Sequence, residues 1–338
     1  MYSMFTGQTA DDVWSSALTK LSEKKDSSVS SRAGDTVELL HTFIHVENPT
    51  QRWVTRRLPP ISICFALAEL IWMLNGSDEA SVINFWNPVL PKFAGSGNRY
   101  HGAYGYRIMY NFGINQLDRA YETLMNNPNS RQTVILIWDP RIDSPDEVGN
   151  PTSNDIPCNI CSLIKIRDSK LEWTQIMRSN DLYLGLPYNF IQFTSLQEIL
   201  AGWLRVEIGS YCHYSDSLHL YRRDINSIGI DDGVNIRNSD SLCATREETL
   251  DAVRQIFHNM TRLSSQALSE TEMHKISNID TGIRAYKNIM YMITAYVSDR
   301  SGYNNLTNFL VTECTNPLYV SIWNRWKSIN RKGDGIHG

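Results

Sequence analysis

The spacing of hydrophobic residues along the chain predicts a mixture of helices and strands. Apolar residues that recur with a helical period predict helices over 10–23, 62–75, 114–126, 188–205, 245–265 and 280–298. Shorter runs rich in β-branched and aromatic residues predict strands over 36–46, 132–138, 160–166, 171–177 and 211–221. Because these elements do not follow a strict strand–helix–strand order, the pattern indicates an α+β fold.

Length, charge and cysteine content narrow the class of protein. The 338 residues are enough for one large domain or two ordinary ones. The formal net charge is −4, so no overall basic field attracts nucleic acid. No apolar run reaches the roughly 20 residues that span a bilayer, and the first residues do not resemble a signal peptide. Six cysteines are too sparse for a disulfide scaffold, so we expect a cytoplasmic protein. Together, the charge, the apolar runs and the cysteine spacing lead us to expect no metal, membrane or nucleic-acid partner.

One candidate nucleophile follows a long polar loop. Residues 139–157 are rich in Pro, Asp, Ser and Asn, and Cys158 ends this loop just before a predicted strand. A thiol there can meet a ligand, and a nearby arginine would raise its thiolate fraction. The alternative is that Cys158 is a small buried hydrophobic residue.

A group of polar residues could hold a phosphate. Arg178 and Ser179 follow the strand 171–177, and a guanidinium with a hydroxyl suits phosphate oxygens. Arg32 and Arg131 are candidates to join them. The alternative for each arginine is a surface salt bridge.

Four further positions carry chemistry that their elements do not require. Asn189 begins a predicted helix, where it could cap the helix or match a uracil edge. His219 and Tyr221 share one strand face and could bind a sugar hydroxyl, or line a half-buried polar face. Glu69 lies in an apolar helix, where burial would raise the pKa of its carboxyl and suit it to acid–base work.

Six motifs together resemble the thymidylate synthase superfamily. They occur in the family's order between about 30 and 225: S-R-A-G at 31–34, A-E-L-I-W-M-L-N-G at 68–76, G-A-Y-G-Y at 102–106, P-C at 157–158, R-S-N-D-L-Y-L-G-L-P-Y-N at 178–189 and H-L-Y at 219–221. The resemblance implies a mixed sheet flanked by helices. It also implies a catalytic core over 1–225 and a divergent helical extension, 226–338, packed on the same domain.

The resemblance assigns roles residue by residue. Cys158 would add to C6 of a pyrimidine nucleotide, with Glu69 and Tyr104 moving protons at the base and Asn159 standing where the family usually has histidine. Residues that would bind the nucleotide are Arg32, Arg131, Arg178, Ser179, Asn189, His219 and Tyr221. Arg131 would reach the phosphate of the partner subunit in a homodimer. Residues that would bind the folate are Asp181, Leu184 and Gly185.

The activity implied is transfer of one carbon from 5,10-methylenetetrahydrofolate, a co-substrate, to C5 of dUMP. Asn159, the lack of a clear equivalent of the tryptophan near the folate, and the absence of the family's closing tail weaken the case for a dry pocket, so they favour 5-hydroxymethylation. Asn189 favours uracil, because cytosine-specific relatives carry aspartate there. Alternatives are a thymidylate synthase that makes dTMP, a dCMP or CMP hydroxymethylase, a nucleotide-binding regulatory homologue, and a Cys/His hydrolase using Cys158 and His219.

Overall fold

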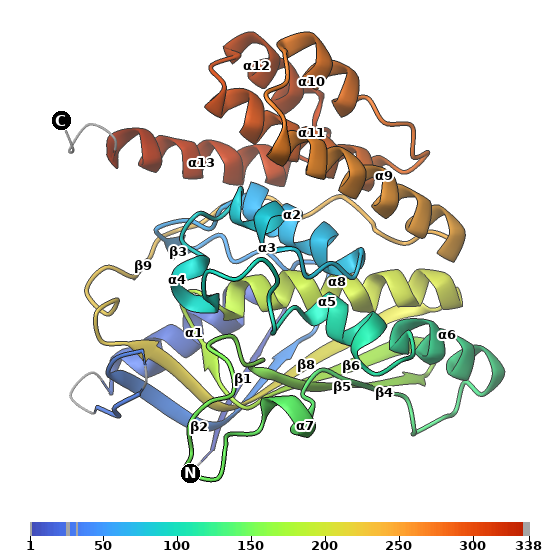
Figure 1. Cartoon of the computed structure of the whole chain (residues 1–338). Coiled ribbons are helices and arrows are strands. Elements are labelled where there is room, and N and C mark those ends of the chain that lie inside the picture. Colours follow the sequence, from blue (N-terminus) through green and yellow to red (C-terminus); the bar gives the residue numbers. More distant parts are fainter. Residues whose placement is uncertain (1, 25–27, 32, 334–338) are drawn as a thin grey trace. The chain divides into compact units, whose positions relative to one another are not determined.

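The chain folds into two compact units, each assembled from separate stretches of sequence. The computed structural model describes residues 2–24, 28–31 and 33–333, with side chains through residue 329 (Figure 1). Unit 1 comprises 1–61, 114–139 and 157–235, and unit 2 comprises 62–113, 140–156 and 236–338. Each unit is described by itself.

Unit 1 is built on a mixed sheet of seven strands. The strand order is β1–β2–β8–β6–β5–β4, and β7 pairs with β8. The β1–β2, β6–β8 and β7–β8 pairs are parallel and the others are antiparallel. The strands are β1 (Ser3–Gly7), β2 (Thr36–Val46), β4 (Val134–Leu136), β5 (Asn159–Arg167), β6 (Lys170–Met177), β7 (Asn180–Asp181) and β8 (Glu207–Tyr221). A separate ribbon pairs β3 (Arg57–Leu58) with β9 (Gly229–Ile230).

Three helices belong to unit 1: α1 (Ala10–Ser22), α6 (Gln116–Asn126) and α8 (Leu186–Leu204). Figure 1 shows α8 lying along the sheet, where it packs on β6 and β8. Nearly every residue of α8 is buried, as expected for a helix in the protein interior. The buried Gln197 amide donates to the carbonyls of Leu171, at 2.8 Å, and Ser210, at 3.0 Å, and so ties α8 to both strands.

The sheet carries a cross-strand row of mostly apolar side chains that are at least partly exposed. Strand register places its members side by side: Met4, Phe43, Tyr214, Ile176, Cys161 and Leu136. Met4 is 64% exposed, Phe43 46% and Leu136 44%. The rings of Phe43 and Tyr214 lie 5.1 Å apart. We call these six residues the apolar row.

Unit 2 is helical. Its buried centre pairs α2 (Ile63–Leu74) with α11 (Arg284–Arg300), where the Cys64 thiol donates to the Met292 carbonyl at 3.2 Å. The Asp240 carboxylate accepts bonds from the side-chain amides of Asn288 and Asn316, both at 3.0 Å or less. The other elements are α3 (Ala80–Asn84), α4 (Pro91–Ala94), α5 (Tyr104–Tyr106), the π-helix η1 (Arg107–Asn111), α7 (Pro140–Asp143), α9 (Arg246–Ser265), α10 (Glu270–Ser277), α12 (Asn304–Glu313) and α13 (Pro317–Gly333).

The predicted α+β class with a mixed sheet is confirmed. Strand 36–46 is observed with the same bounds as β2, and the hairpin 160–177 is observed as β5 and β6. The strand expected over 132–138 is shorter, although the Ile137 and Trp138 amides still bond to the Ile160 carbonyl at 2.9 and 3.1 Å. In the described part of the tail, α9 and α11 were expected, while α10, α12 and α13 were not. Within the described ranges, every helix is too short or too polar to cross a lipid bilayer.

Candidate active site

Cys158 is joined to Arg178 by the backbone of two neighbouring strands. Cys158 is half-buried directly before β5, and Arg178 directly follows β6. The Arg178 amide donates to the Cys158 carbonyl at 3.0 Å, and its guanidinium Nε donates to the Pro157 carbonyl at 3.0 Å. The antiparallel β5–β6 pairing therefore brings together two motifs that are twenty positions apart in sequence. The Arg178 guanidinium is thus anchored on the residue that precedes Cys158.

Ser179, His219 and Tyr221 form a second part of the same site. The Ser179 hydroxyl lies 3.4 Å from His219 Nδ1. The rings of His219 and Tyr221 meet edge to face at 5.3 Å, as expected for alternate residues of one strand. Burial raises the pKa of Tyr221, and the charges of Asp181 and Cys158 raise it further, against the opposing charge of Arg223. Tyr221 therefore lies close enough to Cys158 for a thiolate there to raise the pKa of the Tyr221 hydroxyl.

Asp181 shapes the turn between β7 and α8. Its Oδ1 accepts hydrogen bonds from the amides of Tyr183, at 2.7 Å, and Leu184, at 3.0 Å. Burial raises the pKa of Asp181, and the nearby His219 opposes that shift. Burial also lowers the pKa of His219, and Asp181 opposes that shift. One carboxylate oxygen thus holds the turn, and the described hydrogen bonds leave Oδ2 for another partner.

Gly185 is required by close packing rather than by an unusual backbone angle. A Cβ atom at this position would lie 3.1 Å from the Asn180 side-chain oxygen and 3.1 Å from the Asp181 carbonyl. Both contacts are tighter than a methyl group normally tolerates. The resemblance assigns Gly185 to the folate site, and within the described residues its close contacts are to the chain itself.

Asn189 lies in the first turn of α8, but it is not the helix cap. The N-cap position is Gly185, so the capping interpretation of Asn189 is wrong. Asn189 is buried, and its Nδ2 donates to Asn180 Oδ1 at 3.1 Å and to the Met177 sulfur at 3.5 Å. The amide is therefore held by specific partners at the edge of β6 and β7.

Asn159, next to the nucleophile, is fully buried. Its Oδ1 accepts a hydrogen bond from Gln175 Nε2 at 2.8 Å, while its Nδ2 has no partner among the described residues. The cross-strand neighbour of Asn159 is Met177, which contacts Asn189. Asn159 therefore has a donor that a ligand or water would satisfy, since a buried unpaired N–H is costly.

Glu69 and Tyr104 belong to unit 2 and are described apart from Cys158. Glu69 is partly exposed on α2, whose other residues are buried. Tyr104 begins α5, and the next residue, Gly105, packs directly on the Met73 carbonyl of α2. Because Met73 is one helical turn after Glu69, this contact brings the two motifs together within unit 2. Arg131 is exposed before β4, and Arg32 lies outside the described residues.

Residues that sequence reasoning missed also line this region. The buried guanidinium of Arg57 lies 4.1 Å over the Tyr183 ring, beside the turn formed by Asp181. Asn180 and His213 are buried and bonded to each other at 2.9 Å. Asn180 is inside the 178–189 motif at a position where the family pattern is variable, so the motif gave it no role. His213 lies in the polar alternation of 211–221, which predicted a strand and nothing more.

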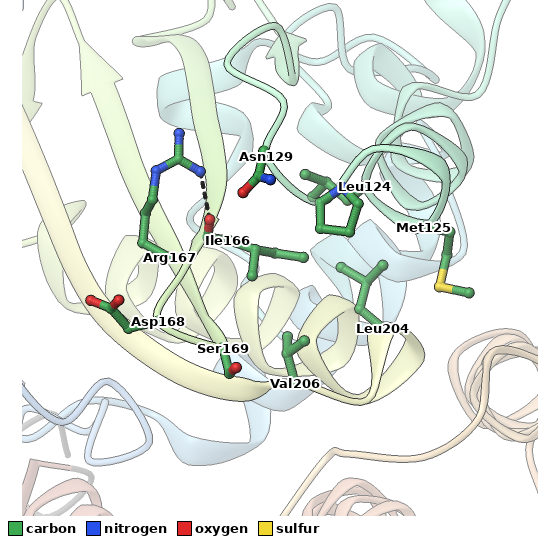
Figure 2. Close-up of a pocket in the computed structure, with 10 residues that line it drawn as sticks. Leu124, Met125, Asn129, Ile166, Arg167, Asp168, Ser169, Leu204 and Val206 are labelled. Carbon is green, nitrogen blue, oxygen red and sulfur yellow. Dashed lines mark hydrogen bonds between the residues drawn. The ribbon is translucent and has the colours of Figure 1, made fainter.

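A hollow elsewhere in unit 1 does not involve these residues. A cavity of about 460 Å³ lies at the turn between β5 and β6. Figure 2 shows the side chains that line it, which come from α6, the turn itself and the end of α8. Arg167 and Asp168 lie on its rim and Leu124, Ile166 and Leu204 inside it. None of the predicted site residues lines this cavity. The candidate active site is thus identified by its chemistry rather than by the size of a hollow.

Most of the chain is similar to one family of known proteins. Residues 30–296 match the family model described as thymidylate synthase, which extends past the last motif at 221 and into α11. The deoxyuridylate hydroxymethyltransferase of Bacillus phage SP01 is 32% identical over 250 residues, 69% of this chain and 64% of that protein. The protein of the same name from Pseudomonas phage M6 is 31% identical over 178 residues, 52% of this chain and 48% of that protein.

More distant relatives carry a different name. The thymidylate synthase of Francisella philomiragia is 27% identical over 181 residues, 50% of this chain and 65% of that protein. The chain thus spans less than two thirds of the length of each of these relatives. The family model nevertheless covers most of the chain, including Cys158, Arg178, Asn189 and His219 at their motif positions. The chain belongs to the thymidylate synthase family.

Proposed function

We propose that this protein transfers one carbon from 5,10-methylenetetrahydrofolate to C5 of dUMP and releases 5-hydroxymethyl-dUMP. The observation that carries the proposal is the pairing of Cys158 with Arg178 at adjoining ends of β5 and β6. A nucleophilic thiol beside an arginine suits covalent attack on a nucleotide. The names of the phage relatives, deoxyuridylate hydroxymethyltransferase, support the same reaction.

The proposed chemistry begins with a covalent adduct. The Cys158 thiolate forms a bond to C6 of uracil, and C5 becomes nucleophilic and attacks the methylene carbon of the folate. C5 then loses its proton, and breaking the carbon–nitrogen bond releases tetrahydrofolate and leaves an exocyclic methylene on C5. Water adds to that methylene, and the Cys158–C6 bond breaks, which gives the hydroxymethyl product. We assign the proton transfers at the base to Glu69 and Tyr104.

The remaining roles are those that the family resemblance implies. Arg178 and Ser179 would hold the 5′-phosphate with Arg32, and His219 with Tyr221 would hold the sugar. The Asp181 turn, with Leu184 and Gly185, would hold the pterin of the folate, because the described bonds of Asp181 leave one carboxylate oxygen for a donor. Asn159 offers a buried N–H near the nucleophile, where the family usually has histidine. An amide here can orient a water molecule, which fits a product made by hydration.

We also propose that the protein is a homodimer. The apolar row leaves Met4, Phe43 and Leu136 largely exposed, and a contiguous exposed patch of this kind marks an interaction surface. Arg131 is exposed just before β4, so it is free to reach the phosphate bound by a partner subunit. Within unit 2, α9, α11 and α13 pack on α2, and α9 also packs on α3, which supports the proposal that 226–338 extend the catalytic core. All six cysteines carry free thiols, as a reducing cytoplasm would leave them.

The test is mass spectrometry of the nucleotide made from dUMP and 5,10-methylenetetrahydrofolate, with dCMP as a parallel substrate. A hydroxymethyl product with tetrahydrofolate released supports the proposal. A methyl product with dihydrofolate formed would instead assign thymidylate synthesis, which the name of the Francisella relative favours. Release of tritium from C5 of labelled dUMP by the wild type, and its loss in Cys158→Ser, would separate an enzyme from a nucleotide-binding homologue without turnover.

A further inference from the structure

A chain of buried hydrogen bonds runs from β8 to Asn189. The Tyr211 hydroxyl lies 3.0 Å from His213 Nδ1, His213 Nε2 lies 2.9 Å from Asn180 Nδ2, and Asn180 Oδ1 accepts from Asn189 Nδ2 at 3.1 Å. Tyr211, His213 and Asn180 are at most 1% exposed, and Asn189 is 6% exposed. We call Tyr211, His213 and Asn180 the relay, which ends at Asn189. Asn189 is the residue that the family resemblance assigns to recognition of the uracil base.

The direction of each hydrogen bond in the relay follows from the groups present. An amide nitrogen only donates, so His213 Nε2 accepts from Asn180 and carries no proton. Burial lowers the pKa of His213 to about 3, so its ring is neutral and has a single N–H. That N–H is therefore on Nδ1 and donates to the Tyr211 hydroxyl. With its nitrogen facing His213, Asn180 turns its oxygen toward Asn189.

The same logic fixes the amide of Asn189. Its Nδ2 has two hydrogens, and two acceptors meet it: Asn180 Oδ1 and the Met177 sulfur. A thioether has no proton to give, so the opposite orientation of the amide would lose both bonds. Among the described residues no donor reaches Asn189 Oδ1. The relay thus occupies the donor side of the amide and leaves its acceptor for a ligand.

We propose that the relay of Tyr211, His213 and Asn180 sets the base specificity of Asn189 by holding its carbonyl oxygen toward the pyrimidine. This inference rests on the proposed function. Uracil has an N3–H that donates to such an oxygen, whereas N3 of cytosine is an acceptor and opposes it. If the relay ran in the other direction, Asn189 would present its NH₂ and would match cytosine instead. Asn180 and His213 are therefore positioning residues that act through Asn189.

The experiment compares dUMP with dCMP in wild type, Asn180→Leu and Asn180→Asp, measured as the ratio of kcat/KM values. Leucine removes the acceptor for Asn189, so the preference for dUMP should fall about tenfold to a hundredfold, which is the usual effect of one lost buried hydrogen bond. Aspartate keeps an acceptor toward Asn189, and His213 can donate to it from the other tautomer, so Asn180→Asp should retain most of the preference. An Asn180→Leu enzyme that keeps turnover with an unchanged ratio would overturn the inference, since a merely structural role would not change the ratio.

A second measurement does not depend on turnover. Nitrogen-15 NMR of labelled histidines, with the His213 signal identified by its loss in His213→Gln, should show a neutral ring protonated on Nδ1. A ring protonated on Nε2 would reverse the relay and overturn the inference, even if both Asn180 variants failed to fold. A wild type that turns over neither nucleotide but shows the Nδ1 tautomer would instead count against the proposed function alone.

Discussion

Replacing Gly105 with alanine should damage unit 2 at the contact that places Tyr104. A Cβ built on Gly105 would lie 2.0 Å from the Met73 carbonyl oxygen, 2.7 Å from its carbon and 2.8 Å from the Met73 Cα. All three atoms are backbone atoms of α2, so no side-chain rotation can relieve the overlap. The start of α5 must therefore move away from α2.

The size of the effect follows from that overlap. Atoms of this kind do not approach closer than about 3 Å, so the separation must grow by about 1 Å, and overpacking of this kind lowers the free energy of unfolding by about 1–3 kcal/mol. The moving segment carries Tyr104, to which we assign proton transfer at the base. A displacement of about 1 Å in a positioning element lowers turnover by about a hundredfold.

The assay is guanidinium unfolding followed by tryptophan fluorescence, together with tritium release from C5 of dUMP. Gly229→Ala is the control, because its Cβ would meet the nearest atom, Leu58 Cβ, at an ordinary 3.7 Å. We expect a lower unfolding midpoint and lower turnover for Gly105→Ala, with neither change in Gly229→Ala. If Gly105→Ala kept the wild-type midpoint and turnover, the assigned contact between α5 and α2 would be refuted.

Four other changes have defined outcomes. Cys158→Ser should lower tritium release at least about a thousandfold, while calorimetry should still detect binding of dUMP to the variant. Tritium release near the wild-type rate would show that Cys158 is not the nucleophile. Burial lowers the pKa of His213 from 6.5 to about 3 in the folded protein. Below pH 6.5 the unfolded chain therefore binds a proton that the folded protein does not, so the free energy of unfolding decreases as the pH falls, by about 2 kcal/mol at pH 5. His213→Gln should remove that part of the pH dependence in denaturant titrations, and an unchanged slope would argue against it. Phe43→Asp should convert a dimer to a monomer in light scattering, and a wild-type monomer would disprove the assembly. Gly185→Ala, which crowds Asn180, should lower kcat/KM for dUMP about tenfold, whereas an unaltered value would mean that the turn adapts.

The parts of the fold with strong local patterns were predictable from sequence. The hairpin of β5 and β6 shows alternation and a polar turn, and α8 is a long apolar segment, so both were found with nearly correct bounds. In the tail, α10 begins with a capping box in which Ser269 and Glu272 bond to each other's amides, and α13 begins at Pro317. These start signals were present in the sequence, and the prediction did not use them.

The candidate site shows a different limit. The motifs identified Cys158, Arg178 and Asn189 individually, and strand pairing explains why the first two meet. The partners that hold Asn189 are not adjacent in sequence, since it bonds to Asn180 and Asn180 in turn bonds to His213 on β8, 24 positions after Asn189, and no period in the sequence links them. The strand β7, with two residues, is also too short to show any alternation. Such contacts depend on register across the sheet, which hydrophobic patterning does not specify at the level of one residue.

The interleaving of the two units has a consequence for how the chain reaches its native state. Unit 1 needs the segments that end at residues 61, 139 and 235, and unit 2 joins 62–113 to residues beyond 236. During synthesis β2 cannot pair with β8, its central partner in the sheet, until well over a hundred further residues have been made. Likewise, the apolar surface of α2 stays exposed until α11 has been made and can pack on it. Contacts between segments so far apart in sequence slow folding and leave aggregation-prone intermediates with exposed apolar surface. Chaperones should therefore raise the yield of active protein more than they would for a chain whose domains follow one another in sequence.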